Sequence, residues 1–441
     1  MKAVARFLPL AAALALALAG PARADGLLAL YEAARAYDAS WQSAKAQYEA
    51  NLARAEQARA GLLPQAGLSA GVSRSTLDVN TPPTDRAFGT RSATLSASQP
   101  LYRPANLATW HQGQRQAELA AYQLTAAGQD LMIRVSQAYF DVLAAQDTLT
   151  FVRAQKAATA EQLASAKRNF EVGTSTITDT REAQARYDLV LAQEIAAEND
   201  LRVKRLALDT LVGRSDTQPD PLATPLDVPP PQPASPEAWV AAADTASPPI
   251  LQARTAVEIA ELETDKAEAG HKPTVDLTAS YGWTHNVNGS AATNLDNRPR
   301  VGTAGIVMNL PLFAGFAIQN RIRETLSLEE KARADLEATR RQVAQAVRTA
   351  YFGVVSGQGQ VRALEAAEAS SQSALDANRL GYQVGVRINI DVLNAQSQLF
   401  QTKRDLAQAR YNVLLGHLKL RQANGTLAEE DLARLNALLV R

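Results

Sequence analysis

The sequence predicts a mainly α protein with a small β part, built from two structural repeats in one chain. Three observations support this prediction: a series of motifs that occurs twice, two very long runs without proline, and short stretches in which apolar and polar residues alternate. An internal repeat of this length usually consists of two copies of one supersecondary unit packed side by side. We therefore expect the two halves to be related by a pseudo-twofold axis.

The repeat is visible as matching motifs that lie 212 positions apart. Ala138-Tyr139-Phe140 in the first half corresponds to Ala350-Tyr351-Phe352 in the second. In the same register, Phe170-Glu171-Val172-Gly173 corresponds to Tyr382-Gln383-Val384-Gly385. Because the register is held over such a distance, each motif has to be interpreted in both halves.

The repeats also define the expected boundaries. Residues 1–24 have the pattern of a secretory signal peptide, with Lys2 and Arg6 before a short apolar run and Ala22-Arg23-Ala24 at the cleavage position. We expect a first repeat at 25–213, a proline-rich linker at 214–236, a second repeat at 237–425 and a C-terminal segment at 426–441. The leader predicts export from the cytoplasm, and the absence of cysteine excludes a disulfide scaffold.

Helices are expected to account for most of both repeats. The runs from Ala105 to Phe170 and from Ala317 to Tyr382 contain no proline. At about 1.5 Å per residue, each predicts a helix on the order of 100 Å long. Shorter helices are expected at 27–60, 175–211, 249–269 and 389–423. The last of these has apolar residues seven positions apart, which indicates coiled-coil packing: Val392, Leu399, Leu406, Val413 and Leu420.

Two β-hairpins are predicted, at about 66–100, with a loop that holds Pro82-Pro83, and at about 273–311. In the second, Leu277, Ala279 and Tyr281 alternate with polar residues, as in a strand with one apolar face. Four strands cannot close a barrel, and an open sheet edge is not tolerated in lipid. The alternation fits either a soluble sheet that caps a helical bundle or a membrane sheet shared among several chains. The leader favours the membrane sheet.

The linker is expected to be extended, because its prolines cannot continue a helix. We assign it a structural role without chemistry. After it, Ser235-Pro236 and Ser247-Pro248 predict the starts of two helices. Serine is the expected N-cap in each, with proline near the first helical position.

Together these motifs resemble those of the TolC family of outer-membrane efflux proteins, over essentially the whole mature chain. The most specific stretch is Gly381-Tyr382-Gln383-Val384-Gly385-Val386-Arg387, followed by Asp391-Val392-Leu393-Asn394-Ala395. The resemblance implies a trimeric helical (coiled-coil) periplasmic barrel joined to a shared twelve-stranded outer-membrane β-barrel. Such a protein lies in the cell outer membrane with a large periplasmic portion.

The resemblance also implies the function and the partners. It indicates the channel-tunnel of a tripartite efflux or type I secretion system, which is a passive exit duct. The implied partners are two further copies in a homotrimer, a periplasmic adaptor (membrane fusion) protein, an inner-membrane transporter and outer-membrane lipid. The cargo is not indicated, because drugs, metals and secreted proteins all leave through tunnels of this type.

The same resemblance implies roles for residues at the ends of the long helices. An aperture ring would consist of Asp391 and Asn394, with Asn394 in place of a second acidic residue. The gate latch would consist of Thr178, Asp179, Tyr382 and Arg387. The adaptor-docking tips would be Val172, Gly173, Thr174, Val384, Gly385 and Val386. Simpler roles remain open, since Gly173 and Gly385 suit plain turns and Asp179 suits a helix cap.

An enzyme is not predicted. The histidines His111, His271, His285 and His417 show no metal-ligand spacing, and there is no nucleophile elbow or phosphate loop. We therefore expect no catalytic residue, cofactor or metal, and the net charge of zero predicts no nucleic-acid partner. The competing hypothesis is a periplasmic coiled-coil scaffold or adaptor protein without a membrane barrel. Such a protein would share the leader and the heptads but would need no hairpins with a lipid-compatible face.

Overall fold

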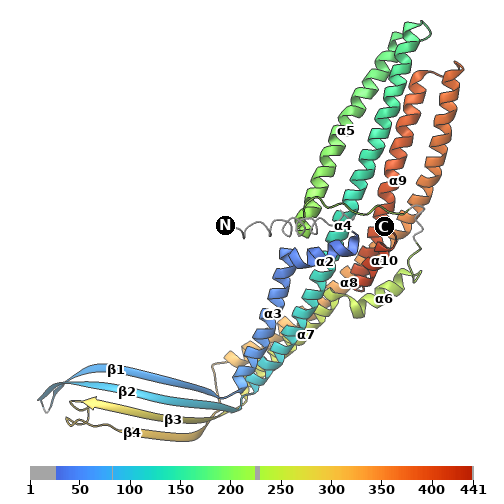
Figure 1. The fold of residues 1–441 in the computed structure, drawn as a ribbon. Coiled ribbons are helices and arrows are strands. Elements are labelled where there is room, and N and C mark those ends of the chain that lie inside the picture. Colours follow the sequence, from blue (N-terminus) through green and yellow to red (C-terminus); the bar gives the residue numbers. More distant parts are fainter. Residues whose placement is uncertain (1–25, 82, 224–228, 440–441) are drawn as a thin grey trace, which may run out of the picture. The chain divides into compact units, whose positions relative to one another are not determined.

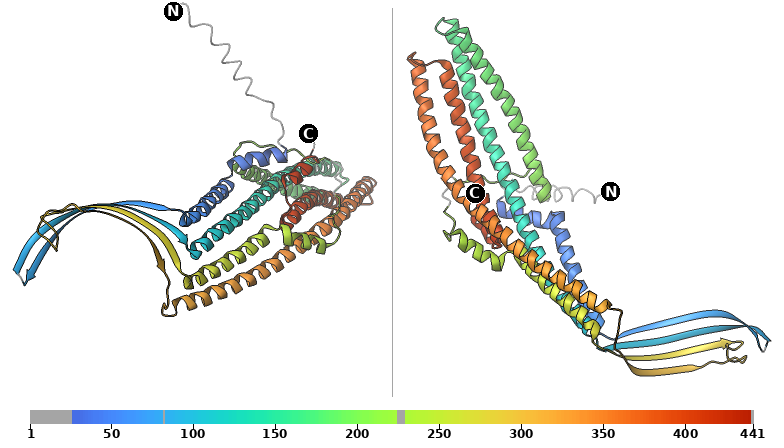
Figure 2. Two further views of the ribbon diagram at one scale, coloured as in Figure 1. Left: turned by 90° about the horizontal axis from the view of Figure 1, so that it is seen from below. Right: turned by 180° about the vertical axis from the view of Figure 1, so that it is seen from behind.

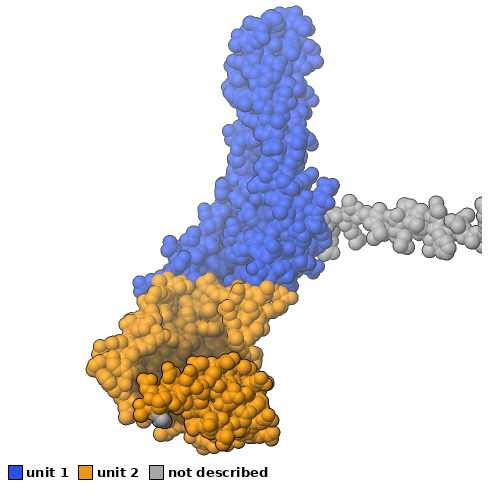
Figure 3. Space-filling view, turned by 90° about the vertical axis from the view of Figure 1, so that its left-hand side faces the viewer, with its two compact units in different colours: residues 1–44, 125–248, 341–441 blue, residues 45–124, 249–340 orange. Residues whose placement is uncertain are grey.

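The structure is a computed structural model that describes residues 26–81, 83–223 and 229–439 (Figure 1). The expected signal peptide lies outside the described residues. The chain divides into two compact units (Figure 3). Unit 1 comprises 1–44, 125–248 and 341–441, and unit 2 comprises 45–124 and 249–340. Each unit draws on both sequence repeats, because the long helices contribute residues to both units.

Helices dominate the described residues, as predicted. They are α2 (Leu27–Tyr37), α3 (Ala39–Arg59), α4 (Pro104–Glu171), α5 (Ile177–Val212), α6 (Pro236–Ala246), α7 (Pro248–Glu268), α8 (Ala317–Gln383), α9 (Asn389–Asn424) and α10 (Glu429–Asn436). The long helices α4 and α8 have 68 and 67 residues. Within the described part of the chain, no helix is long and apolar enough to cross a membrane.

The heptad seam predicted in the last long stretch is buried in α9. Its five members are at most 3% exposed: Val392, Leu399, Leu406, Val413 and Leu420. The α9 helix thus contributes a continuous apolar stripe to the packing of unit 1.

The first helical stretch is divided at Asp38, whereas the sequence predicted one helix over 27–60. The Asp38 carboxylate accepts a hydrogen bond from the amide of Trp41 at 2.8 Å and acts as the N-cap of α3. It also forms an ion pair with Arg134 of α4 at 3.0 Å. The hydrogen bonds from Arg134 hold the pKa of Asp38 well below its usual range, against the opposing effect of burial.

We expect Asp38→Ala to lower the free energy of unfolding by about 2 kcal/mol, because it removes a cap and a charged hydrogen bond. The folded-state pKa of Asp38 is depressed, so its contribution is present above the ordinary pKa of an aspartate. The contribution is lost as the pH falls through the folded-state pKa. Melting curves in detergent should show a smaller difference between wild type and variant at about pH 3 than at about pH 7. An equal difference at both would contradict this. Asp130→Ala is the control, since Asp130 pairs with the same Arg134 but is 60% exposed.

Unit 2 contains a four-stranded sheet in the order β1-β2-β3-β4, antiparallel throughout (Figure 2). The first hairpin consists of β1 (Gln65–Asn80) and β2 (Pro83–Tyr102), and the second of β3 (Thr274–Val287) and β4 (Arg300–Asn309). Pro83, expected in the loop of the first hairpin, is instead the first residue of β2. Pairing of β2 with β3 joins the two repeats in one sheet.

The sheet presents apolar side chains that this chain does not cover. Leu68 and Val72 of β1 are 75% and 82% exposed, and Ile306 and Met308 of β4 are both 67% exposed. The strands β1 and β4 are the edges of the sheet. An apolar surface of this kind indicates contact with something other than water.

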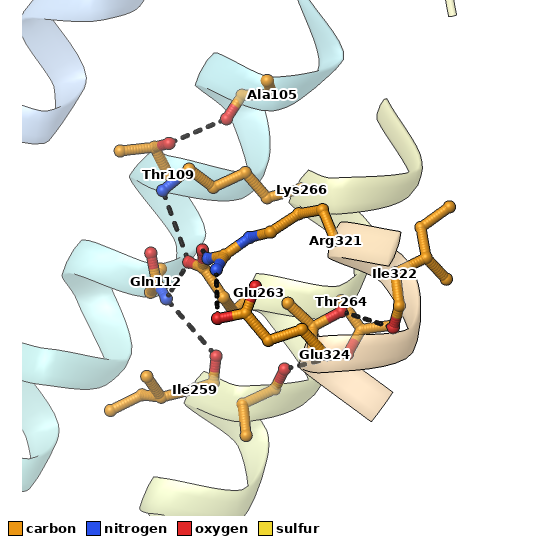
Figure 4. A network of polar contacts seen from close by, with 12 residues as sticks. Ala105, Thr109, Gln112, Ile259, Glu263, Thr264, Lys266, Arg321, Ile322 and Glu324 are labelled. Carbon is orange, nitrogen blue, oxygen red and sulfur yellow. Dashed lines mark hydrogen bonds and ion pairs between the residues drawn. The ribbon is translucent and has the colours of Figure 1, made fainter. Parts of the chain in front are cut away.

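A polar network in unit 2 also joins the two repeats (Figure 4). Glu263 of α7 accepts hydrogen bonds from Gln112 of α4 at 3.0 Å and from Arg321 of α8 at 2.6 Å. Lys266 donates to the same carboxylate at 3.3 Å. Burial raises the pKa of Glu263, but the hydrogen bonds from Gln112 and Arg321 outweigh burial, so the pKa is lowered. One carboxylate thus connects three helices.

In unit 1, the duplicated Ala-Tyr-Phe motif fixes the linker. Tyr139 is buried, and its hydroxyl donates a hydrogen bond to the backbone carbonyl of Asp220 at 2.8 Å. The hydroxyl of Tyr351 donates to the backbone carbonyl of Ala234. The repeated tyrosine therefore holds the linker backbone at two points. Ser235 occupies the N-cap position of α6 and Pro236 is its first residue, as predicted. The Ser235 hydroxyl makes no cap hydrogen bond to the backbone and donates instead to the Glu237 carboxylate at 2.9 Å.

Candidate functional site at the helical tips

The tips are the two turns that join α4 to α5 and α8 to α9, and they have the same geometry (Figure 1). Gly173 and Gly385 both have φ of 80°. The amide of Thr174 donates to the carbonyl of Asn169 at 2.8 Å, and the amide of Val386 donates to that of Gly381 at 2.9 Å. These bonds define Schellman motifs, in which the left-handed position favours glycine. The prediction that glycine reverses each long helix is confirmed.

Both tips expose apolar side chains beside open space. Val172, Val384 and Val386 are 73%, 65% and 76% exposed. A Cβ added at Gly173 or Gly385 would meet nothing within 4 Å. Within this chain, the glycines are thus required by backbone conformation and not by close contact.

Asp179 belongs to a capping box at the start of α5. The Thr176 amide donates to its carboxylate at 2.9 Å, and the Asp179 amide donates to the Thr176 hydroxyl at 3.2 Å. The hydroxyl of Ser175 donates to the same carboxylate at 2.7 Å. Burial raises the pKa of Asp179, yet these hydrogen bonds outweigh it and lower the pKa. Asp179 is therefore a charged N-cap partner at ordinary pH.

The side chains predicted for the latch and the aperture have other partners within the chain. The Tyr382 hydroxyl accepts a hydrogen bond from Asn169 at 3.2 Å. Arg387 lies 3.6 Å from the Asp391 carboxylate, four positions along the chain. Asp391 is in the first turn of α9, where a negative charge favours the helix. Asn394 accepts a hydrogen bond from Arg186 of α5 at 2.8 Å.

Among the described residues of one chain, no hydrogen bond joins Tyr382 or Arg387 to Thr178 or Asp179. The Asp179 carboxylate instead accepts hydrogen bonds from Ser175 and Thr176 at the N-terminus of its own helix, α5. A latch built from these four residues would require neighbouring copies of the chain. It stays a prediction.

The sequence profile of the family described as "Outer membrane efflux protein" matches residues 30–214 and 239–426, one match in each repeat. The chain belongs to this family. The two matched segments confirm the duplication predicted from the sequence.

Relatives of this outer membrane efflux protein cover nearly its whole length. Outer membrane protein TolC of Vibrio cholerae is 34% identical over 98% of both chains. Alkaline protease secretion protein AprF of Pseudomonas aeruginosa is 34% identical over 92% of this chain and 86% of its own. The crystal structure of the outer membrane protein VceC of Vibrio cholerae has the same fold, with a TM-score of 0.77 at 21% identity. The match covers 90% of this chain and 96% of that one.

Family membership decides between the hypotheses left open by the sequence. This efflux protein lies in the outer membrane, with a large periplasmic part, and acts as an exit duct. The periplasmic scaffold without a membrane portion is thereby set aside. The family consists of channel proteins.

Sequence reasoning missed several polar residues at the tips. Asn169 and Arg186 were not singled out, although both bond to predicted site residues. Asn389 is only 1% exposed and was also missed. It lies about one helical turn before Val392, on the face of α9 that carries the heptad seam. A polar residue on this face is a signal that could have identified it.

Proposed function

We propose that three copies of this efflux protein form a homotrimeric tunnel through which cargo leaves the cell. The open edges of the sheet carry this proposal, because unpaired backbone groups are very costly in lipid. Pairing of β1 in one copy with β4 in the next would close a shared twelve-stranded barrel surrounded by outer-membrane lipid. Light scattering on detergent-solubilised protein should give about three times the mass of one mature chain. A well-folded monomer would contradict the proposal.

The narrowest part of this tunnel is assigned to Asp391 and Asn394 at the start of α9. A latch between copies would bring Tyr382 and Arg387 of the α8/α9 hairpin to Thr178 and Asp179 of a neighbouring α4/α5 hairpin. Opening would move the α8/α9 hairpin relative to the α4/α5 hairpin, which is a population shift between two packings. Partly exposed bonds suit such a gate, because each contributes only about 0.2 to 1 kcal/mol.

The tunnel is passive in this proposal. An inner-membrane transporter supplies the energy, and a periplasmic adaptor docks on the tips formed by Val172-Gly173-Thr174 and Val384-Gly385-Val386. The exposed valines support docking, because the chain itself leaves this apolar surface uncovered. The open space above Gly173 and Gly385 leaves room for the backbone of a partner.

We expect Val172→Asp combined with Val384→Asp to abolish export in cells, because the added carboxylates oppose burial against an adaptor. The measurement is accumulation of a fluorescent efflux substrate in cells that carry the variant in place of the wild-type gene. The purified variant should retain wild-type single-channel conductance in a bilayer, which shows that the duct itself is intact. Wild-type export by the variant would remove the tips from the docking surface.

Two cargo classes are supported by the relatives. One relative is named for secretion of an alkaline protease, and a more distant one, of Pseudomonas putida, for toluene efflux. We propose that this duct serves a type I secretion system or an efflux pump. Deletion of the gene should either remove a polypeptide from the culture medium or increase the sensitivity of the cells to a toxic small molecule. If the deletion caused neither of these two changes, that result would contradict an export role.

A further inference from the structure

A buried asparagine connects the two helical hairpins of one chain near their tips. Asn389, the first residue of α9, is 1% exposed. Its side-chain oxygen accepts a hydrogen bond from the amide of Gln162 on α4. Its own amide donates to the backbone carbonyl of Asp179 on α5 at 3.3 Å. One side chain from the α8/α9 hairpin is thus bonded to both helices of the α4/α5 hairpin.

An apolar cluster made by both hairpins lies next to these hydrogen bonds, since Leu163 follows Gln162 and Ile390 follows Asn389 in the chain. The buried members of the cluster are each at most 8% exposed: Leu163, Ala166, Ala183 and Leu393. Ile390 packs against the same cluster. Because Asn389 is shielded from water while the hairpins are packed, its hydrogen bonds do not compete with solvent and contribute more than comparable bonds at the surface.

A second link lies at the surface further along the same helices. Arg186 lies two helical turns beyond Asp179 on α5, and it donates to Asn394 of α9 at 2.8 Å. This bond is exposed to solvent, and water can replace such a bond at little cost. The buried bonds of Asn389 are therefore the stronger of the two links between the hairpins.

We propose that Asn389 is the main positioning residue of the closed state, acting as a clasp that holds the α8/α9 hairpin against the α4/α5 hairpin within each copy. This inference rests on the proposed gate, in which the hairpins move relative to each other. It adds a step inside each chain that precedes release of the latch between copies. Opening must break the bonds from Asn389 to Gln162 and to the Asp179 carbonyl.

The test is the double variant Gln162→Leu/Asn389→Leu in a planar bilayer. Asn389→Leu alone would leave the Gln162 side-chain amide without its hydrogen-bond acceptor. The double variant removes both side chains of that bond and leaves only the Asp179 carbonyl without its donor from Asn389. We expect the open probability to rise at least about tenfold, which corresponds to about 1.4 kcal/mol. A folded double variant that opens no more often than the wild type would overturn the proposal.

The matched control is Asn424→Ala. Asn424 is a buried asparagine at the other end of α9, 3% exposed, which accepts hydrogen bonds from the amide and the hydroxyl of Thr426. Its loss should lower the melting temperature without changing the open probability. An equal rise in open probability in this control would show that general destabilisation, and not the clasp, opens the channel.

A second measurement does not depend on folding of the double variant. The chain has no cysteine, so Ala183→Cys places a single thiol in the apolar cluster that both hairpins build, at a position that is 0% exposed. When combined with Tyr382→Phe/Arg387→Ser, which opens the proposed latch, the thiol should react with a maleimide at least about tenfold faster. If this latch variant conducts more but the thiol stays protected, the latch stands and the clasp is overturned. If neither conductance nor labelling changes, the gate has been placed wrongly and both proposals fail.

Discussion

Tyr382→Phe combined with Arg387→Ser should raise the conductance of the channel. The double variant removes the hydrogen bond that Tyr382 accepts from Asn169 and the ion pair of Arg387 with Asp391. It also removes both α8/α9 members of the proposed latch. At about 0.5 kcal/mol for each bond, two bonds in three copies amount to about 3 kcal/mol, or about a hundredfold change in the open population.

The control for this prediction is Tyr122→Phe combined with Arg115→Ser. On α4, Tyr122 donates to Glu118 at 2.8 Å and Arg115 pairs with the same carboxylate at 2.7 Å. The control removes the same chemical groups from a helix surface in unit 2, away from the tips. Its conductance should equal that of the wild type. Wild-type conductance in the Tyr382/Arg387 variant as well would remove both residues from the gate.

Asp391→Asn should abolish the cation preference of the channel. The substitution removes three carboxylates from the proposed aperture and leaves three Arg387 guanidinium groups without their ion-pair partner. Because position 394 is already an asparagine, held by Arg186, no other acidic ring is expected at this level. Selectivity in the wild type should accordingly be modest, and in the variant it should shift toward anions.

The measurement is the reversal potential in a gradient of potassium chloride. Asp335→Asn is the control, since Asp335 is a 60% exposed aspartate on α8 in unit 2 that pairs with Lys331. The control should keep the wild-type reversal potential. An unchanged reversal potential in Asp391→Asn would place the selective ring elsewhere.

Most of the fold follows from patterns that are local in the sequence. Long helices without proline, heptad spacing in α9 and alternation in β3 are each set by residues close together in the chain. The break at Asp38 was missed, although Asp38 and Ser40 carry a capping signal, because the helices on both sides contain no glycine or proline to mark an end. Pairing of β2 with β3 joins strands from different repeats, about 170 to 200 positions apart in the sequence. No short turn connects these strands, so the turn residues that predict each hairpin do not predict this pairing.

The candidate site was only partly predictable for a related reason. Turn glycines leave a local signature, and Gly173 and Gly385 have the expected left-handed backbone. Bonds between hairpins leave none, because Gln162 and Asn389 are 227 positions apart. The resemblance to a family assigns roles to positions that share its motif. It does not indicate partners such as Asn169 or Arg186, which lie outside the motif.

We propose that this outer membrane efflux protein is a trimeric duct closed at its helical tips. The most direct test is single-channel recording of the detergent-extracted wild-type protein in a planar bilayer. Small, weakly cation-selective current steps are the predicted result, because the proposed aperture at Asp391 and Asn394 would restrict the pore. Large, unselective steps would contradict closure at the tips, and well-folded protein that forms no channels would contradict the duct itself.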